Sequence, residues 1–379
     1  MYISVVCINN TGKSVIMAEK NTADYDKLMG ARSTERDGLR WLSVDVPPLR
    51  LSGLAFRKSG EALRRLPVDP AFPEAINHLG GHTAGVQLAF RSDTTNVAVS
   101  VRLCDDSKMN HIARIGSSGF DLYVGPPKQR WFIGASRFAF DADSYEVKLN
   151  QFPFPGGETR EFLINFPLYS GVESFELGLD PGSSLEAPEP WDDPRPVVIY
   201  GTSITQGGCA SRPGMAWTNI LSRKWNLPVL NFGFSGSGKG EPEVIRAIAR
   251  VADPRMFVLD YEPNAGPEGI RKTLEGTLDI LRSAHPETPI VVISSTRHNP
   301  EIPAAGALME RAAVRRESRD FQYETVRRRR AAGDRNIAFV DGGLPDADWH
   351  EHTVDGVHPT DLGFYRIAGY LAPFLEEWL

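Results

Sequence analysis

The sequence has few cysteines, no long apolar run and no excess of basic residues. Its three cysteines, Cys7, Cys104 and Cys209, are odd in number and widely spaced, with no metal-ligand pattern, which suits a reducing compartment. No apolar run reaches the ~18 residues of a membrane span, so we expect no membrane partner. The formal net charge of −6 argues against a nucleic-acid partner, because such a partner requires a basic surface.

The N-terminal stretch, residues 1–8, is apolar but lacks the basic leader of a signal peptide. It is also short for a signal core followed by a cleavage site, so we expect the cytoplasm as the default location. Hydrophobic residues make up 41% and charged residues 24% of the chain, as in ordinary globular proteins. The length of 379 residues is sufficient for two domains.

The first part of the chain has the period of β-strands. Residues 1–35 show no clear period and are predicted to be an N-terminal extension of uncertain order. Across residues 36–187 apolar side chains alternate with polar or small ones in short runs separated by turn signals, as at Val97, Val99 and Val101. Many short alternating strands predict an all-β sandwich, jelly-roll-like.

A proline-rich and acidic linker, residues 180–194, precedes a change of pattern. Beyond it, in the predicted domain 188–379, short apolar strands alternate with helices. This pattern predicts an α/β domain with a five-stranded parallel sheet covered on both faces. Strands are expected at residues 196–200, 228–231, 256–260, 289–294 and 336–340, and helices at 215–225, 241–251, 269–284, 304–332 and 361–378.

Ser203 follows the first strand of this second domain, where open α/β sheets bind their ligands. It is a candidate nucleophile, although a serine in this place is also a common helix N-cap. A serine hydroxyl needs a base, and a carboxylate should hold the imidazole of that base in one tautomer. Asp355 and His358, three apart on the last loop, are the candidates for these two roles.

Two further loops carry groups that could stabilise a developing oxyanion. Gly236 lies on the loop after the second strand, and Asn264 lies in a loop after the third. The predicted donors are the N–H groups of Ser203 and Gly236 and the side-chain amide of Asn264. Each has an alternative role as an ordinary turn residue.

These residues resemble the serine, glycine, asparagine and histidine of the SGNH (GDSL-like) hydrolase superfamily, at Ser203, Gly236, Asn264 and His358. The run 119–123, Gly-Phe-Asp-Leu-Tyr, resembles the GxDLY signature of a β-sandwich domain that precedes the hydrolase in a two-domain branch. The resemblance implies a three-layer flavodoxin-like fold and a serine esterase that needs no metal or cofactor. It also implies acyl esters as substrates, with acetyl esters of carbohydrates most frequent, on small molecules or oligosaccharides.

The chain departs from the wider superfamily at two points. Thr202 replaces the aspartate of the Gly-Asp-Ser block, and Pro263 and Ala265 flank Asn264 in place of Gly and Asp. The sequence leaves open whether Asp260 or Glu262 supplies the lost support.

Asp121 and Tyr123 point to the face of their predicted strand opposite Phe120 and Leu122. They are therefore candidates for contact with the second domain.

Three other functions are compatible with the sequence. A thioesterase or a lipase-type acyl hydrolase would use the same groups, although no amphipathic lid pattern is present. A non-catalytic carbohydrate-binding protein would retain the sandwich and a degenerate hydrolase domain. The sequence also leaves a homo-oligomer open.

Overall fold

The computed structural model describes residues 33–105, 107–296, 306–343 and 349–379. The predicted N-terminal extension lies outside these residues except for 33–35, which belong to strand β1 (Ser33–Arg36). Within the described ranges, no helix combines the length and the apolar character needed to cross a membrane.

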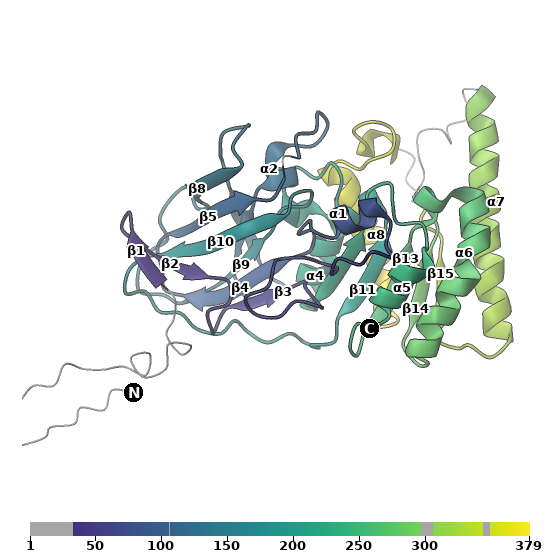
Figure 1. Ribbon diagram of the computed structural model, residues 1–379, viewed down its shortest axis with the longest axis horizontal. Coiled ribbons are helices and arrows are strands. Elements are labelled where there is room, and N and C mark those ends of the chain that lie inside the picture. The colour runs from purple at the N-terminus through teal and green to yellow at the C-terminus, as the bar shows by residue number, and fades with distance from the viewer. Residues whose placement is uncertain (1–32, 106, 297–305, 344–348) are drawn as a thin grey trace, which may run out of the picture.

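The first half of the chain folds into two antiparallel five-stranded sheets (Figure 1). Their facing side chains, among them Val99 and Leu177 from one sheet and Leu88 and Ile164 from the other, form one buried cluster. The predicted β-sandwich is therefore confirmed. In spatial order the first sheet contains β1, β2 (Leu39–Ser43), β10 (Val172–Leu179), β5 (Val97–Leu103) and β8 (Ser144–Lys148). The second contains β3 (Arg50–Ser52), β4 (Gln87–Ser92), β9 (Arg160–Asn165), β6 (Asp121–Val124) and β7 (Trp131–Ala135).

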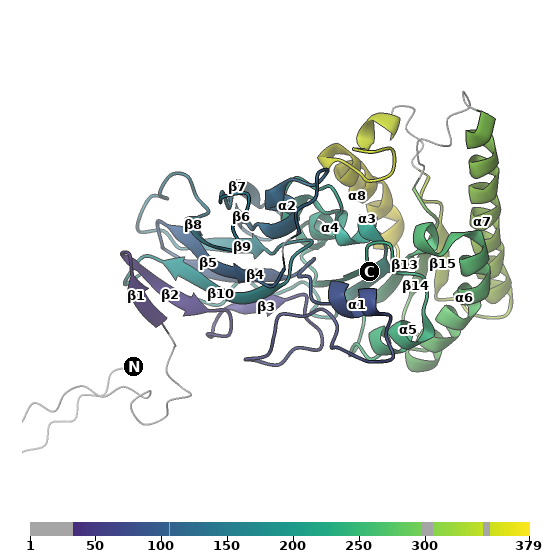
Figure 2. The same cartoon turned by 45° about the horizontal axis from the view of Figure 1, so that its top comes forward.

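The second half forms a parallel five-stranded sheet, as predicted. Its strand order is that of flavodoxin-like folds, with the first and third strands adjacent at the sheet centre. The strands in order are β12 (Val229–Gly233), β11 (Val197–Gly201), β13 (Met256–Asp260), β14 (Ile290–Ile293) and β15 (Ile337–Val340). Among the residues that the structure describes, the helices are α1 (Glu74–Leu79), α2 (Arg114–Ser118), α3 (Ser203–Gln206), α4 (Trp217–Trp225), α5 (Pro242–Ile248), α6 (Glu262–Ala284), α7 (Gly306–Ala331) and α8 (Asp361–Glu376) (Figure 2). Short 3-10 turns occur at Pro213–Met215 and Trp349–His352.

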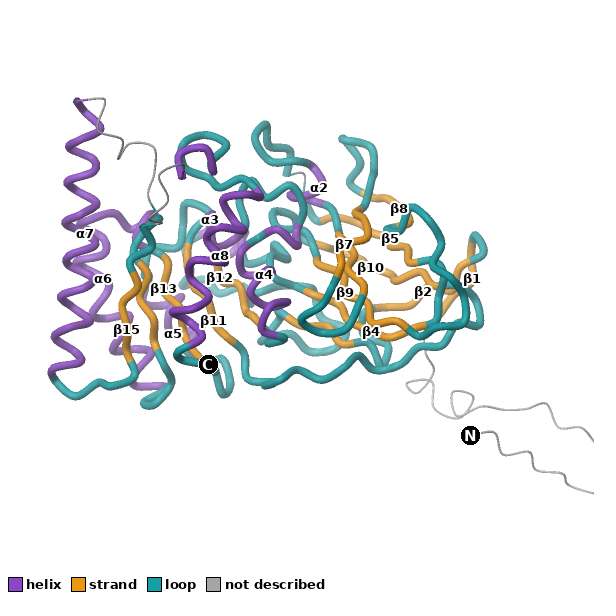
Figure 3. Tube along the Cα trace, turned by 180° about the vertical axis from the view of Figure 1, so that it is seen from behind, coloured by secondary structure: helices purple, strands orange, loops and turns teal. Residues whose placement is uncertain are grey.

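Successive residues of strand β11 are buried on opposite faces of this sheet. Val197 and Ile199 pack with α4 and α8, whereas Val198 and Tyr200 pack with α5 and α6 (Figure 3). A strand covered on both faces is apolar throughout, which is why it lacks the alternation of the sandwich strands. The three-layer arrangement places the carboxyl ends of β11, β12 and β13 at one edge of the sheet.

Helix α6 begins earlier than the sequence pattern predicts. The expected start at residue 269 lies near the start of the longer segment, whereas a first turn that begins at Glu262 and includes Asn264 precedes it. Gly266, at φ +65°, interrupts the helical backbone between this turn and the longer segment that follows. That interruption hides the first turn from a search for helical periodicity.

The sandwich half covers the edge strand β12. The fully buried Arg65 donates hydrogen bonds to the carbonyl oxygens of Asn231 and Gly233, both at 2.8 Å, and to those of Leu79 and His82. Burial lowers the pKa of Arg65 to about 9. An open strand edge is a site of unwanted pairing, and here the guanidinium occupies two of its carbonyl groups.

Candidate active site

Ser203 is the first residue of the short helix α3. The N-cap is Thr202, whose Oγ1 accepts a hydrogen bond from Ile204 N at 3.2 Å, while Thr205 Oγ1 accepts one from Thr202 N. This reciprocal pair is a capping box, so the alternative in which Ser203 caps the helix is wrong. A side chain on Gly201 would collide with the Thr205 hydroxyl, which explains the glycine two residues before the serine.

The structure brings the predicted serine, histidine and aspartate into one chain of contacts. Ser203 Oγ lies 3.0 Å from His358 Nε2, and His358 Nδ1 lies 2.7 Å from Asp355 Oδ2. Because the carboxylate accepts the Nδ1 proton, Nε2 carries the lone pair and can take the hydroxyl proton. Ser203 itself is 8% exposed. The arrangement can therefore generate a serine nucleophile.

Asp355 is held in its charged form. Its partial burial raises the pKa, but hydrogen bonds from the His358 backbone and ring and from Val357 N outweigh this effect and lower the pKa to about 2. A carboxylate that accepts several N–H groups favours the ionised state. Asp355 is thus ionised at any pH near neutrality, as a carboxylate that orients an imidazole must be.

The oxyanion candidates lie on two adjoining segments. Asn264 Nδ2 donates to Phe234 O at 3.1 Å, which ties the first turn of α6 to the loop of Gly236 and leaves the second amide proton of Asn264 for a ligand. Gly236 has a left-handed φ of +66° with open space around its Cα, so backbone conformation rather than crowding explains the glycine. Among the described residues, no carbonyl accepts the N–H of Ser203 or Gly236.

Asp260 and Glu262 both support the site, but at different places. Asp260 Oδ2 accepts a hydrogen bond from Thr205 Oγ1 at 2.7 Å and so holds the capping box around Ser203. Glu262 Oε2 accepts one from Ser295 N at 2.9 Å, which fixes the start of α6 against the end of β14. Burial, with the nearby charge of Glu262, raises the pKa of Asp260 to about 7 in spite of the Thr205 bond.

The sandwich half contributes to the nucleophile loop. The buried hydroxyl of Tyr169 donates to Ser203 O at 3.3 Å. Gln206 Nε2 donates to Leu168 O at 2.9 Å and to His82 Nδ1 at 3.1 Å, and Gln206 Oε1 accepts from Ser235 N. These residues were missed from the sequence because no local pattern marks partners so far apart along the chain.

The GxDLY run also contacts the hydrolase half, as expected for Asp121 and Tyr123. Asp121 Oδ2 accepts hydrogen bonds from Gly214 N at 2.7 Å and from Arg212 Nη1 at 3.0 Å. The Arg212 guanidinium also donates to the Tyr123 hydroxyl and lies over the ring of Phe132. The segment that follows the nucleophile is therefore attached to β6.

Two groups among the described side chains have the composition of a metal site: His111 with Cys209 and His358, and His78 with His82 and Asp105. In the second group both nitrogens of His82 are engaged, since Nδ1 accepts from Gln206 and Nε2 donates to Asp105 at 2.9 Å. Burial lowers the pKa of His82 and favours this neutral form. The first group adjoins Ser203.

Comparison with known families matches nearly the whole described chain. Residues 194–376 match the GDSL-like lipase/acylhydrolase family, and residues 39–185 match the GxDLY family, the N-terminal domain of SGNH-hydrolase-type esterases. Among curated proteins, no sequence matches the chain.

Solved structures share this two-part architecture. A protein from Bacteroides ovatus ATCC 8483 assigned to the GDSL-like lipases is 29% identical, with a TM-score of 0.80 over 89% of this chain and 97% of its own. The salicylyl-acyltransferase SsfX3 of a tetracycline biosynthetic pathway is 21% identical, with a TM-score of 0.70 over 90% and 98%. A family two carbohydrate esterase from Clostridium thermocellum, in complex with cellohexaose, is 16% identical, with a TM-score of 0.53 over 84% and 99%. The last two show likeness of fold alone.

Proposed function

Because the chain belongs to the GDSL-like lipase/acylhydrolase family, with a GxDLY domain before the hydrolase domain, and is thus an esterase, we propose that Ser203, His358 and Asp355 cleave the ester through an acyl-enzyme. The observation that carries this proposal is the pair of contacts at His358, 3.0 Å to Ser203 Oγ and 2.7 Å to Asp355 Oδ2. A base within hydrogen-bond reach of the hydroxyl, oriented by a carboxylate, activates a serine.

In the first half of the reaction, Ser203 Oγ attacks the carbonyl carbon and its proton passes to His358 Nε2. The bond between the carbonyl carbon and the alcohol oxygen breaks, and His358 returns the proton to the leaving alcohol. In the second half, His358 takes a proton from water, whose oxygen attacks the acyl carbon. The bond between the acyl carbon and Ser203 Oγ then breaks, His358 returns the proton to Oγ, and the carboxylic acid leaves. Asp355 stays ionised and stabilises the imidazolium in both halves.

The negative charge on the tetrahedral oxygen would be met by the N–H groups of Ser203 and Gly236 and by the amide of Asn264. The free N–H groups and the fixed amide favour this assignment, because donors that need no rearrangement stabilise developing charge most effectively.

We infer a short acyl group, most simply acetyl, carried by a carbohydrate. Acetyl esters are the substrates that the resemblance of the sequence implies most often. The fold likeness to a carbohydrate esterase that binds cellohexaose makes a sugar ester the first substrate to test. A thioesterase or a lipase-type hydrolase is the alternative within the same chemistry.

The test is release of acetate from a panel of acetylated mono- and oligosaccharides, beside an acyl thioester and a long-chain triglyceride. Acetate release that disappears in Ser203→Ala supports the proposal. Preferred cleavage of the thioester or of the triglyceride would contradict the assignment of a carbohydrate acetyl ester as the substrate. A fluorophosphonate that labels folded wild-type protein but not Ser203→Ala separates a catalytic serine from a non-catalytic carbohydrate-binding protein.

A further inference from the structure

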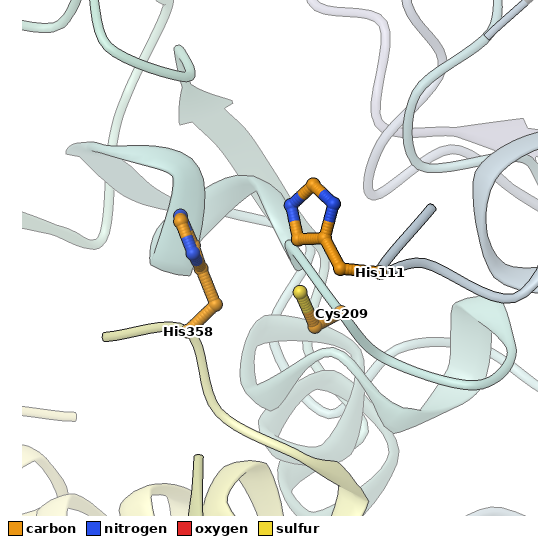
Figure 4. A group of neighbouring side chains, drawn as sticks. All are labelled: His111, Cys209 and His358. Atoms are coloured by element: carbon orange, nitrogen blue, oxygen red, sulfur yellow. The ribbon is translucent and has the colours of Figure 1, made fainter. Parts of the chain in front are cut away.

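His358 has two neighbours with no part in the proposed reaction. Cys209 lies shortly after α3, and His111 lies on the loop between β5 and α2 of the sandwich half. One ligand atom from each of the three side chains lies within 4.8 Å of the other two. In Figure 4 the Cys209 sulfur points between the two imidazole rings, whose centroids are 5.8 Å apart.

We propose that His111, Cys209 and His358 form an inhibitory site for Zn²⁺ or a similar thiophilic divalent cation, which removes the histidine base from Ser203 when it binds. One thiolate and two imidazoles are a ligand set typical of zinc, with a fourth position for water. In a tetrahedral site with ordinary Zn–N and Zn–S bond lengths, neighbouring ligand atoms are about 3.3–3.6 Å apart. The three ligand atoms therefore need to approach one another by about 1.5 Å at most.

The hydrogen bonds of His111 and His358 place the ring proton on Nδ1, so that Nε2 of each ring has the lone pair that a metal needs. His111 Nδ1 lies 3.1 Å from Asn110 Oδ1, an acceptor, so Nδ1 holds the proton and Nε2 has the lone pair. In His358, Nδ1 donates to Asp355, so the lone pair is again on Nε2. A carboxylate behind the ligating imidazole is the usual outer partner of zinc-bound histidine.

Metal binding and the serine–histidine contact exclude each other. The Nε2 lone pair that would bind the cation is the one that lies 3.0 Å from Ser203 Oγ. A serine hydroxyl rotates away at little cost, unlike the buried Gln206 amide that occupies His82 Nδ1 in the other histidine group. Binding converts the Cys209 thiol to a thiolate and releases its proton to solvent, with no change of oxidation state.

The inhibitory effect rests on the proposed role of His358, whereas metal binding does not, so the two are measured separately. Binding is followed with Co²⁺ alone, added to metal-free full-length protein, through the thiolate-to-cobalt absorption band and its loss on addition of Zn²⁺. Wild type and Ser203→Ala should both show the band, because the serine is not a ligand. Cys209→Ser should abolish the band, and His111→Gln should weaken it.

Inhibition is followed by ester hydrolysis against Zn²⁺ concentration, each variant relative to its own metal-free rate. Wild type should lose activity and regain it with a chelator. Cys209→Ser and His111→Gln each remove one ligand, so each should raise the half-inhibitory concentration of Zn²⁺ at least about tenfold. His111 is a partly exposed loop residue. Cys104→Ser, at the exposed free cysteine, and His78→Gln, in the other histidine group, serve as matched controls and should behave as wild type.

Absence of the Co²⁺ band in wild type, its persistence in Cys209→Ser, or activation by Zn²⁺ would overturn the proposal. So would equal inhibition of wild type, Cys209→Ser and His111→Gln. If Ser203→Ala retains hydrolase activity while wild type still binds Co²⁺ through Cys209, the proposed reaction fails and the metal site stands.

Discussion

The carboxylate of Asp121, in the sandwich half, accepts a hydrogen bond from the backbone N–H of Gly214, in the hydrolase half, at 2.7 Å. The same oxygen pairs with Arg212, and Asp121 is completely buried. A side chain on Gly214 would meet Asp121 and Tyr123 at 2.7 Å or less, so the two segments are in direct contact. The aspartate of the GxDLY signature therefore attaches strand β6 of the sandwich half to the 3-10 turn of the hydrolase half.

Replacing Asp121 with Ala should destabilise the whole chain. The change removes the carboxylate that accepts from Arg212 and Gly214 N, and loss of one member of a buried ion pair typically costs about 3–5 kcal/mol. Urea denaturation should show this as a lower midpoint, and Asp141→Ala, at an exposed aspartate of the same half, should not. A midpoint for Asp121→Ala equal to that of wild type would show that this contact does not stabilise the chain.

Asn264→Ala should lower kcat by about 10²–10³ with little change in KM, because an oxyanion donor acts mainly in the transition state. Steady-state kinetics on p-nitrophenyl acetate would measure this. Lys239→Ala, at an exposed position of the same loop as Gly236, is the control. An unchanged kcat for Asn264→Ala would remove the amide from the proposed oxyanion site.

Asp355→Asn should lower kcat by about 10³–10⁴, because the amide no longer holds the imidazole in the required tautomer or balances its charge. The pKa of Asp355 is about 2, so the carboxylate stays ionised throughout the range in which the enzyme would be assayed. Loss of wild-type activity in mild acid should therefore not follow protonation of Asp355. Retention of more than about a tenth of wild-type kcat would argue against the triad.

The raised pKa of Asp260 predicts that the free energy of unfolding depends on pH. Its pKa is about 7 in the folded chain against an ordinary value of 3.8, so between these values the folded state holds a proton that the unfolded state lacks. This contribution to the free energy of unfolding is present in full below pH 3.8 and is lost as the pH rises through about 7.

Asp260→Asn should remove that contribution, since the amide does not titrate but can still accept from Thr205. Urea denaturation at constant ionic strength, in steps from about pH 4 to pH 7, should show a flatter pH dependence for the variant than for wild type. Parallel curves for the two proteins would contradict the raised pKa.

The sequence predicts features that depend on local periodicity. The alternation at Val97, Val99 and Val101 predicts the sandwich, and the apolar strands of the second half predict the parallel sheet, because burial on one face or on both leaves a direct pattern. Strand β3, with three residues, and strand β7, which exposes Trp131 and Phe132, show little of this pattern.

Residues of the site were predictable where a loop motif carries them. Ser203, Asp355 and His358 were placed from their loops, and the structure brings them together. Tyr169 and His111, beside the same site, were not, because they come from the other half of the chain. Contacts between separate segments depend on tertiary packing, which leaves no trace in local sequence pattern.

Arg65 on the edge of β12 bears on how this chain can be divided. The linker near residue 190 looks like a natural point at which to separate the halves, but a fragment starting there would lack the guanidinium that occupies the carbonyl groups of Asn231 and Gly233. Such a fragment would present a bare, apolar strand to other molecules and associate through it. The sandwich and the parallel sheet are therefore separate in architecture but not in stability, because one half supplies the cover for an open edge of the other.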